Sequence, residues 1–161
     1  MLLPDVLAVT RALEEVGVRH WLGGGWGVDA LVGRVTRAHR DLDLAVPAED
    51  LERAVASLES LGYRPETDWR PVRLELAAPG ERWVDLHPVV FDARGDGSQA
   101  GLDGTIFAYP AADLVSGVLA GHVLPCLSVA LQRAFHRGYP PRPEDRHDLA
   151  LLDALTTPPP P

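Results

Sequence analysis

The feature that most constrains this chain is a pair of acidic residues at alternate positions, preceded by a glycine run. Gly24-Gly25-Trp26 closes one apolar segment, and Asp41-Leu42-Asp43 opens the next. In a β-strand, residues i and i+2 point to the same face, so Asp41 and Asp43 would project together. Two carboxylates on one face repel each other unless a cation lies between them, and Mg²⁺ prefers such oxygen ligands. Because glycine lets a backbone approach a phosphate closely, the pattern indicates metal-assisted phosphoryl or nucleotidyl transfer.

The composition indicates what class of protein this is. The chain has 161 residues, of which 46% are hydrophobic, so it can form one domain with a real core. Its formal net charge of −8 argues against general nucleic-acid binding, which normally needs a basic surface. No apolar run reaches the length of a membrane span, and we expect no signal peptide because the start lacks a basic region and a cleavage site. With a single cysteine, Cys126, these features predict a cytoplasmic protein that contacts no membrane.

The order of the elements predicts an α+β fold with a mixed sheet. Apolar residues recur at helical spacing in 4–16 and 49–61, and a glycine follows each stretch. A tight turn at the three glycines is expected to lead into a helix over 26–32. The predicted strands are residues 19–23, 41–46, 73–76 and 82–90.

The final third is expected to be helical. Ser128 is a candidate N-cap for a helix to residue 137, and Pro143 opens a last helix to residue 155. The glycine- and acid-rich segment 92–104 indicates a surface loop. The predicted divisions are a nucleotidyltransferase core (1–110), a C-terminal helical region (111–155) and a disordered proline-rich tail (156–161).

A third acidic residue, Asp85, lies between apolar neighbours in the strand Trp83-Val84-Asp85-Leu86-His87. If this strand lies beside the first acidic strand, all three carboxylates can converge on one or two Mg²⁺ ions. The predicted metal ligands and catalytic residues are therefore Asp41, Asp43 and Asp85. Asp85 is also a candidate general base for an attacking hydroxyl group. An isolated Asp-x-Asp pair is most often a solvated strand edge, but burying three acids without a cation would be very costly.

Several nearby side chains are candidates for substrate contacts. Arg37, His39 and Arg40 precede the acidic strand and could offset the charge of a triphosphate, although His39 or Arg40 could instead brace the strand. Asp29 could bind substrate or brace its loop. His87, on the predicted Asp85 face, could contact the acceptor, order the acid or be an ordinary interior histidine.

The same residues resemble the signature of small antibiotic nucleotidyltransferases. The resemblance begins with Trp21-Leu22-Gly23-Gly24-Gly25-Trp26-Gly27-Val28-Asp29 and His39-Arg40-Asp41-Leu42-Asp43-Leu44. It continues through Trp83-Val84-Asp85-Leu86-His87-Pro88, Leu124–Ser128 and Phe135–Tyr139 to His147-Asp148-Leu149. The chain is similar to short lincosamide nucleotidyltransferases, with aminoglycoside 2''-adenylyltransferases as relatives. Gly23 stands where the lincosamide enzymes have Asp, and Trp26 where many members of the wider superfamily have Ser.

The resemblance implies a DNA-polymerase-β-like nucleotidyltransferase fold, ATP or another NTP as donor, and Mg²⁺ as cofactor. Asp41 and Asp43 match the metal-binding pair, and Asp85 matches the third acid. Gly24, Gly25 and Trp26 match the phosphate-binding turn. The cleft is expected to be completed by the C-terminal helices and by a second copy in a homodimer.

We therefore predict an Mg²⁺-dependent enzyme that moves AMP from ATP onto a hydroxyl of a small antibiotic, with release of pyrophosphate. One alternative is a superfamily member that nucleotidylates a protein or a tRNA, as in toxin–antitoxin systems. Another is a nucleotide-binding module without catalysis, although three intact acids argue against it. The sequence does not name the acceptor.

Overall fold

The computed structural model describes residues 1–156 and is built around a nine-stranded mixed sheet. Seven strands follow the order β3-β4-β5-β2-β1-β9-β8, and a β6–β7 hairpin continues from β5. The pairs β2–β5 and β1–β9 are parallel and the other pairs are antiparallel. The strands are β1 (Trp21–Leu22), β2 (Asp41–Pro47), β3 (Arg64–Trp69), β4 (Arg73–Ala78), β5 (Arg82–Phe91), β6 (Gly97–Ala100), β7 (Ile106–Tyr109), β8 (Leu114–Leu119) and β9 (His122–Leu127). The predicted α+β class and mixed sheet are confirmed.

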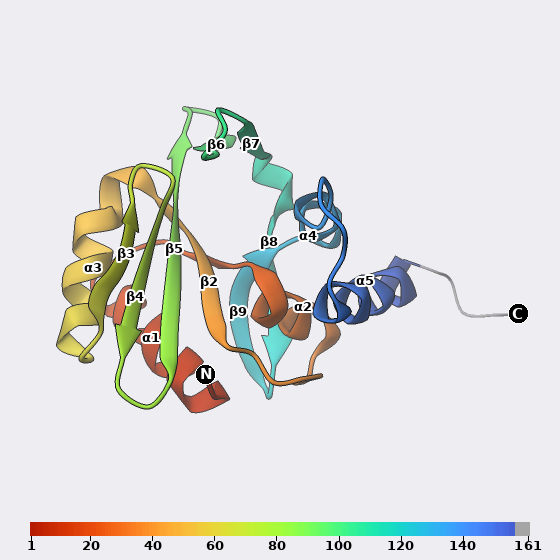
Figure 1. The fold of residues 1–161 in the computed structure, drawn as a ribbon, viewed down its shortest axis with the longest axis horizontal. Helices are drawn as coiled ribbons and strands as arrows, with labels where there is room; N and C mark the ends of the chain where they lie inside the picture. The colour runs from red at the N-terminus through yellow and green to blue at the C-terminus, as the bar shows by residue number, and fades with distance from the viewer. Residues whose placement is uncertain (157–161) are drawn as a thin grey trace, which may run out of the picture.

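Five α-helices accompany the sheet in the described part of the chain. They are α1 (Leu3–Glu15), α2 (Gly24–Val32), α3 (Leu51–Ser60), α4 (Val129–Phe135) and α5 (Pro143–Thr156), with short 3₁₀ turns at Ala48–Asp50 and Ala111–Asp113. Figure 1 shows α1 and α3 beside the β3–β4–β5 end of the sheet, and α2, α4 and α5 toward the β9–β8 end. In residues 1–156 no helix is long and apolar enough to cross a membrane.

The two acidic strands form the middle of the sheet. In β2, Leu42 and Leu44 are wholly buried in the main core, while the alternate residues Asp41 and Asp43 are half-buried. The parallel register with β5 places Asp43 opposite Asp85. The alternation therefore separates an apolar face, which packs in the core, from a face that carries the acids.

The glycine run differs from the prediction. We expected a separate turn before a helix at residue 26, but α2 begins at Gly24 and Gly23 is its N-cap. The Gly27 N–H donates to the Gly23 carbonyl at 2.8 Å, which closes the first helical turn around the glycines. The glycines thus lie inside a helix N-terminus, where backbone N–H groups have no intrahelical partners.

The prediction that the chain is helical from residue 111 is wrong for residues 114–127, which form the β8–β9 hairpin. Ala120 and Gly121 both have positive φ, 50° and 84°, as a two-residue hairpin turn requires. The predicted loop at 92–104 also contains strand β6. The helices at the end of the chain are confirmed: the Ser128 hydroxyl accepts from the Leu131 N–H at 3.1 Å and caps α4.

The proline-rich tail predicted at 156–161 begins one residue too early, because Thr156 belongs to α5. Residues 157–161 lie outside the described residues.

Candidate active site

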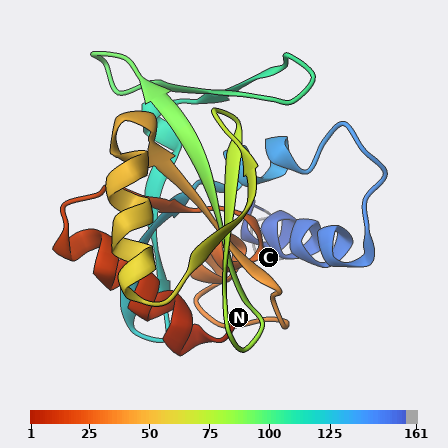
Figure 2. The same ribbon diagram turned by 60° about the vertical axis from the view of Figure 1, so that its left-hand side comes forward.

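A cleft of about 1040 Å³ opens over the acidic face of the sheet. Three groups of side chains line it: the acidic strands with their neighbours, the β6–β7 hairpin, and the C-terminal helices with the loop between them. Figure 2 shows the hairpin projecting above the sheet and the loop that joins α4 to α5 extending to one side. Of the eleven predicted site residues, the cleft is lined by Gly24, Gly25, Arg37, His39, Arg40, Asp41, Asp43, Asp85 and His87.

The centre of the cleft is the group Asp43, Asp85 and His87, which offers three potential metal-ligand atoms within 4.8 Å of one another. Two of these three residues are carboxylates, which suit Mg²⁺. Burial raises the pKa of Asp85 to about 6. Burial alone would also raise the pKa of Asp43, but the hydrogen bond from His87 and the charges of Arg73 and Arg142 lower that pKa.

Asp41 lies on the same face but outside this close group. Its carboxylate accepts a long hydrogen bond from Arg40, at 3.4 Å between Nη1 and Oδ2. Burial, and next the negative charge of Asp43, raise the pKa of Asp41. The two aspartates of β2 therefore feel each other's charge, which is the repulsion that a bound cation would relieve.

Arg73 is a site residue that the sequence analysis missed. Its Nε donates to Asp85 Oδ1 at 2.7 Å, and its Nη2 donates to Glu75 Oε2 at 3.2 Å. Since Glu75 lies opposite Asp85 in the antiparallel β4–β5 register, alternation in 73–76 could have placed these side chains on the acidic face.

Gly24 makes the closest approach between the helix N-terminus and the acids. It has a positive φ of 50°, and a Cβ at this position would overlap Asp43 Oδ2. Gly25 is equally crowded, because a Cβ there would overlap the His39 ring. Both glycines are therefore required by the space around them, as well as by conformation.

Gly24→Ala is expected to lower the transfer rate by roughly 10- to 100-fold because the new methyl group displaces Asp43. The positive φ should also cost about 1–2 kcal/mol of stability. Steady-state kinetics and thermal unfolding measure the two effects. Gly62→Ala is the matched control, since Gly62 has a φ of 88° but no atom within 4 Å of a Cβ. Equal activity of the two variants would contradict this account of Gly24.

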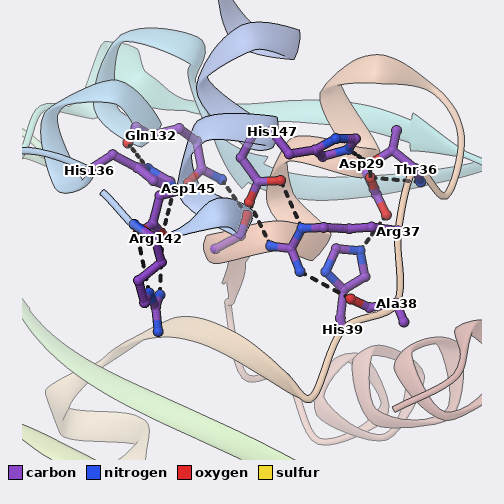
Figure 3. Close-up of polar contacts among 12 residues, drawn as sticks. Asp29, Thr36, Arg37, Ala38, His39, Gln132, His136, Arg142, Asp145 and His147 are labelled. Atoms are coloured by element: carbon purple, nitrogen blue, oxygen red, sulfur yellow. Dashed lines mark hydrogen bonds and ion pairs between the residues drawn. The ribbon is translucent and has the colours of Figure 1, made fainter. Parts of the chain in front are cut away.

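Asp29 and His39 are joined in a buried network, although His39 also lines the cleft. Asp29 Oδ1 accepts from the Thr36 N–H at 3.1 Å and from the Thr36 hydroxyl at 2.6 Å, and Asp29 Oδ2 lies 2.6 Å from His39 Nε2. Asp29 is wholly buried and does not line the cleft. The contacts therefore match the bracing alternative for both residues (Figure 3), and the prediction that Asp29 touches substrate is not supported.

Trp26, predicted to bind nucleotide, is also buried and absent from the cleft lining. Its ring packs against His39, with 4.5 Å between the ring centroids. Only its backbone, in the first turn of α2, remains available for a phosphate.

Arg37 joins the segment before β2 to α5. Its Nε and Nη2 donate to the two carboxylate oxygens of Asp148 at 2.9 and 2.6 Å, and its Nη1 donates to the Ala38 carbonyl. Figure 3 labels Arg37 and Ala38, and dashed lines mark the contacts of the Arg37 guanidinium. The predicted nucleotide contact of Arg37 would thus compete with a bidentate ion pair, whereas the Arg40 guanidinium is more exposed and stacks over Trp83.

The far side of the cleft is aromatic and was missed by the sequence analysis. Phe107 and Tyr109 of β7 both pack against Phe135 of α4, with ring centroids 5.8 and 5.1 Å apart. Arg142 also lines the cleft and donates to both oxygens of Asp145 at 3.1 and 3.2 Å. No local motif marks these residues, because the pocket brings together a hairpin and two helices.

Comparisons with known proteins agree with this geometry. The family model for aminoglycoside-2''-adenylyltransferase matches residues 5–152. The chain is 33% identical over 152 residues to a lincosamide resistance protein of Staphylococcus haemolyticus, and this alignment covers 94% of each protein. It is 39% identical over 82 residues to a 2''-aminoglycoside nucleotidyltransferase of Klebsiella pneumoniae. This alignment covers 50% of this chain and 44% of that protein.

The fold comparison extends over the whole site. The crystal structure of the lincosamide antibiotic adenylyltransferase LnuA with lincomycin bound superposes with a TM-score of 0.87 and 30% identity, covering 97% of this chain and 99% of that one. This likeness confirms the predicted DNA-polymerase-β-like nucleotidyltransferase fold. Together with a family model that spans nearly all of the described residues, it shows that the chain belongs to the aminoglycoside-2''-adenylyltransferase family.

Proposed function

We propose that this adenylyltransferase moves AMP from ATP onto a hydroxyl group of a lincosamide antibiotic, with an aminoglycoside as the second candidate acceptor. The observation that carries the proposal is the pairing of Asp43 with Asp85 across two parallel strands, directly beside the glycine-rich start of α2. Carboxylates and free backbone N–H groups at one point suit a metal-bound triphosphate. The relative named as a lincosamide resistance protein, which is 33% identical over 152 residues, supports this acceptor class.

Asp43 and Asp85 would hold Mg²⁺, with Asp41 as a further ligand from the same strand. The ion would neutralise phosphate charge and orient the reacting oxygens. If Asp85 acts as the general base instead, Oδ2 is the oxygen that would accept the proton of the attacking hydroxyl, because Arg73 occupies Oδ1. Burial raises the pKa of this carboxylate to about 6, which makes it a stronger base than an ordinary aspartate.

The triphosphate would lie along the start of α2, where the N–H groups of the first turn and the helix dipole favour an anion. Arg40 lines the same part of the cleft with an exposed guanidinium and could pair with the leaving pyrophosphate. The role of Arg37 is more indirect, since it anchors the segment that carries Arg40.

The acceptor side favours a molecule with an apolar part. Phe107, Tyr109 and Phe135 form an aromatic wall, while Asp103 and Glu144 line the cleft with negative charge. A lincosamide combines an alkylated ring and one basic amine with a sugar, whereas an aminoglycoside is a polycation without a large apolar part. The wall therefore suits the lincosamide better.

The alternative targets fit the cleft less well. A tRNA would need a basic surface, but the net charge is −8. A non-catalytic module would not need Asp85 as a buried carboxylate with a raised pKa. We propose the cytoplasm as the site of action, because ATP is the donor.

Mass spectrometry tests the proposal directly. The protein is incubated with Mg²⁺, each NTP in turn, and lincosamides, aminoglycosides or a buffer control. We expect a lincosamide to gain one AMP in the presence of ATP, and an aminoglycoside to gain less or nothing. An aminoglycoside as the preferred acceptor would reverse the assignment, and no product with any small molecule would refute it.

A further inference from the structure

A chain of hydrogen bonds runs from the β6–β7 hairpin to the central carboxylate. The Tyr109 hydroxyl donates to Gln99 Oε1 at 2.6 Å, and Gln99 Nε2 lies 3.1 Å from His87 Nδ1. His87 Nε2 then lies 3.2 Å from Asp43 Oδ1. Gln99 and Tyr109 are both buried, so each polar group in the chain needs its partner.

The orientation of the Gln99 amide follows from its other contact. Gln99 Nε2 also donates to the Val72 carbonyl at 3.0 Å. A flipped amide would place its oxygen against that carbonyl and its nitrogen against the Tyr109 hydroxyl, so two acceptors would face each other. The amide nitrogen therefore points at His87, and His87 Nδ1 must be the acceptor.

We propose that Gln99 is a positioning residue that holds His87 with its hydrogen on Nε2, so that the ring donates to Asp43 and is not a metal ligand. A ring nitrogen that carries hydrogen has no lone pair for a metal. Although His87 lies in the close group with Asp43 and Asp85, the metal ligands in that group are the two carboxylates.

The donated hydrogen bond fixes the direction of Asp43. With Oδ1 held by His87, Oδ2 is turned toward Gly24 at the start of α2. The hairpin that lines the acceptor side is thereby connected to the carboxylate on the nucleotide side. The effect on catalysis rests on the proposed function, but the state of the ring does not.

Long-range ¹H–¹⁵N NMR of the full chain, labelled at its histidines, measures which ring nitrogen of His87 carries the hydrogen. The measurement does not require enzyme activity. His87 is assigned by its loss in His87→Gln, and spectra are recorded at alkaline pH, where the ring is neutral. We expect a protonated Nε2 and a bare Nδ1 in the natural protein, and averaged shifts from two tautomers in Gln99→Leu. Ser98→Ala is the matched control, since Ser98 is exposed on the same strand. If Gln99→Leu does not fold, Tyr109→Phe should give a smaller shift in the same direction.

Kinetics supply the second readout. Gln99→Leu is expected to lower kcat roughly tenfold while leaving the KM for ATP unchanged, as loss of an outer-shell contact does. A hydrogen on Nδ1 in the natural protein, or a ring unaffected by Gln99→Leu and by Tyr109→Phe, would overturn the proposal. An intact Nε2–H signature in a protein without transfer activity would instead refute only the proposed function.

Discussion

Asp43→Asn is expected to reduce nucleotidyl transfer by roughly 10³-fold, since the site loses a negative charge where metal and phosphate charge must be balanced. Asp43 is the residue on which the site converges: it pairs with Asp85 in the sheet register, accepts from His87 and lies against Gly24. The substitution changes one oxygen to an amide nitrogen and leaves the shape almost unaltered.

The free energy of unfolding should change by less than about 1 kcal/mol in the same variant. Asparagine keeps an acceptor oxygen for His87, and relief of repulsion at Asp41 offsets the lost attraction to the ring. Transfer rates and thermal unfolding are measured together. Asp68→Asn, an exposed carboxylate paired with Arg70 away from the cleft, is the control. Activity of Asp43→Asn within tenfold of the natural protein would contradict the central role of Asp43.

The sequence was sufficient to predict the acidic face because its signals are local. Alternation in 41–46 and 82–90 places acids and leucines on opposite sides of each strand, and that prediction needs no tertiary information. What alternation cannot supply is the register. The parallel pairing that sets Asp43 opposite Asp85 depends on how the rest of the sheet is assembled, and it leaves Asp41 outside the close group.

The missed strands have weak or contradictory local signals. β9 contains Pro125, which usually argues against a strand with neighbours on both sides, yet it lies between β1 and β8. β6 is the polar sequence Gly97-Ser98-Gln99-Ala100, whose strand conformation comes from pairing with β5 and β7. Tertiary contacts determined both elements. Because β6 pairs with β7, which carries Phe107 and Tyr109, neither Gln99 nor the aromatic wall could be predicted from the sequence.

The basic residues show a similar limit. Arg37 and His39 were predicted to contact triphosphate from their position before the acidic strand. Asp148, which pairs with Arg37, lies 111 residues away along the chain. Position near a motif indicates that a residue matters, but only its partners distinguish a brace from a ligand contact.

Arg37→Met is expected to lower the free energy of unfolding by about 3 kcal/mol, because it leaves a buried carboxylate without a cation. Only 2% of the Asp148 side chain is exposed, against 23% for Arg37, so water cannot compensate the lost pair. The two hydrogen bonds to Asp148 also raise the pKa of Arg37, as expected for a guanidinium held by a carboxylate. Urea unfolding of the natural protein and the variant measures the loss.

The double variant Arg37→Met/Asp148→Leu separates the two roles of Arg37. Replacing both charges by apolar groups of similar size should restore stability to within about 1 kcal/mol of the natural protein. If Arg37 is a brace, the KM for ATP recovers with the fold, because the segment before β2 is again anchored on α5. If Arg37 also contacts the triphosphate, the double variant stays stable but keeps a raised KM. A single variant as stable as the natural protein would show instead that the ion pair contributes nothing to holding α5 against the nucleotidyltransferase site.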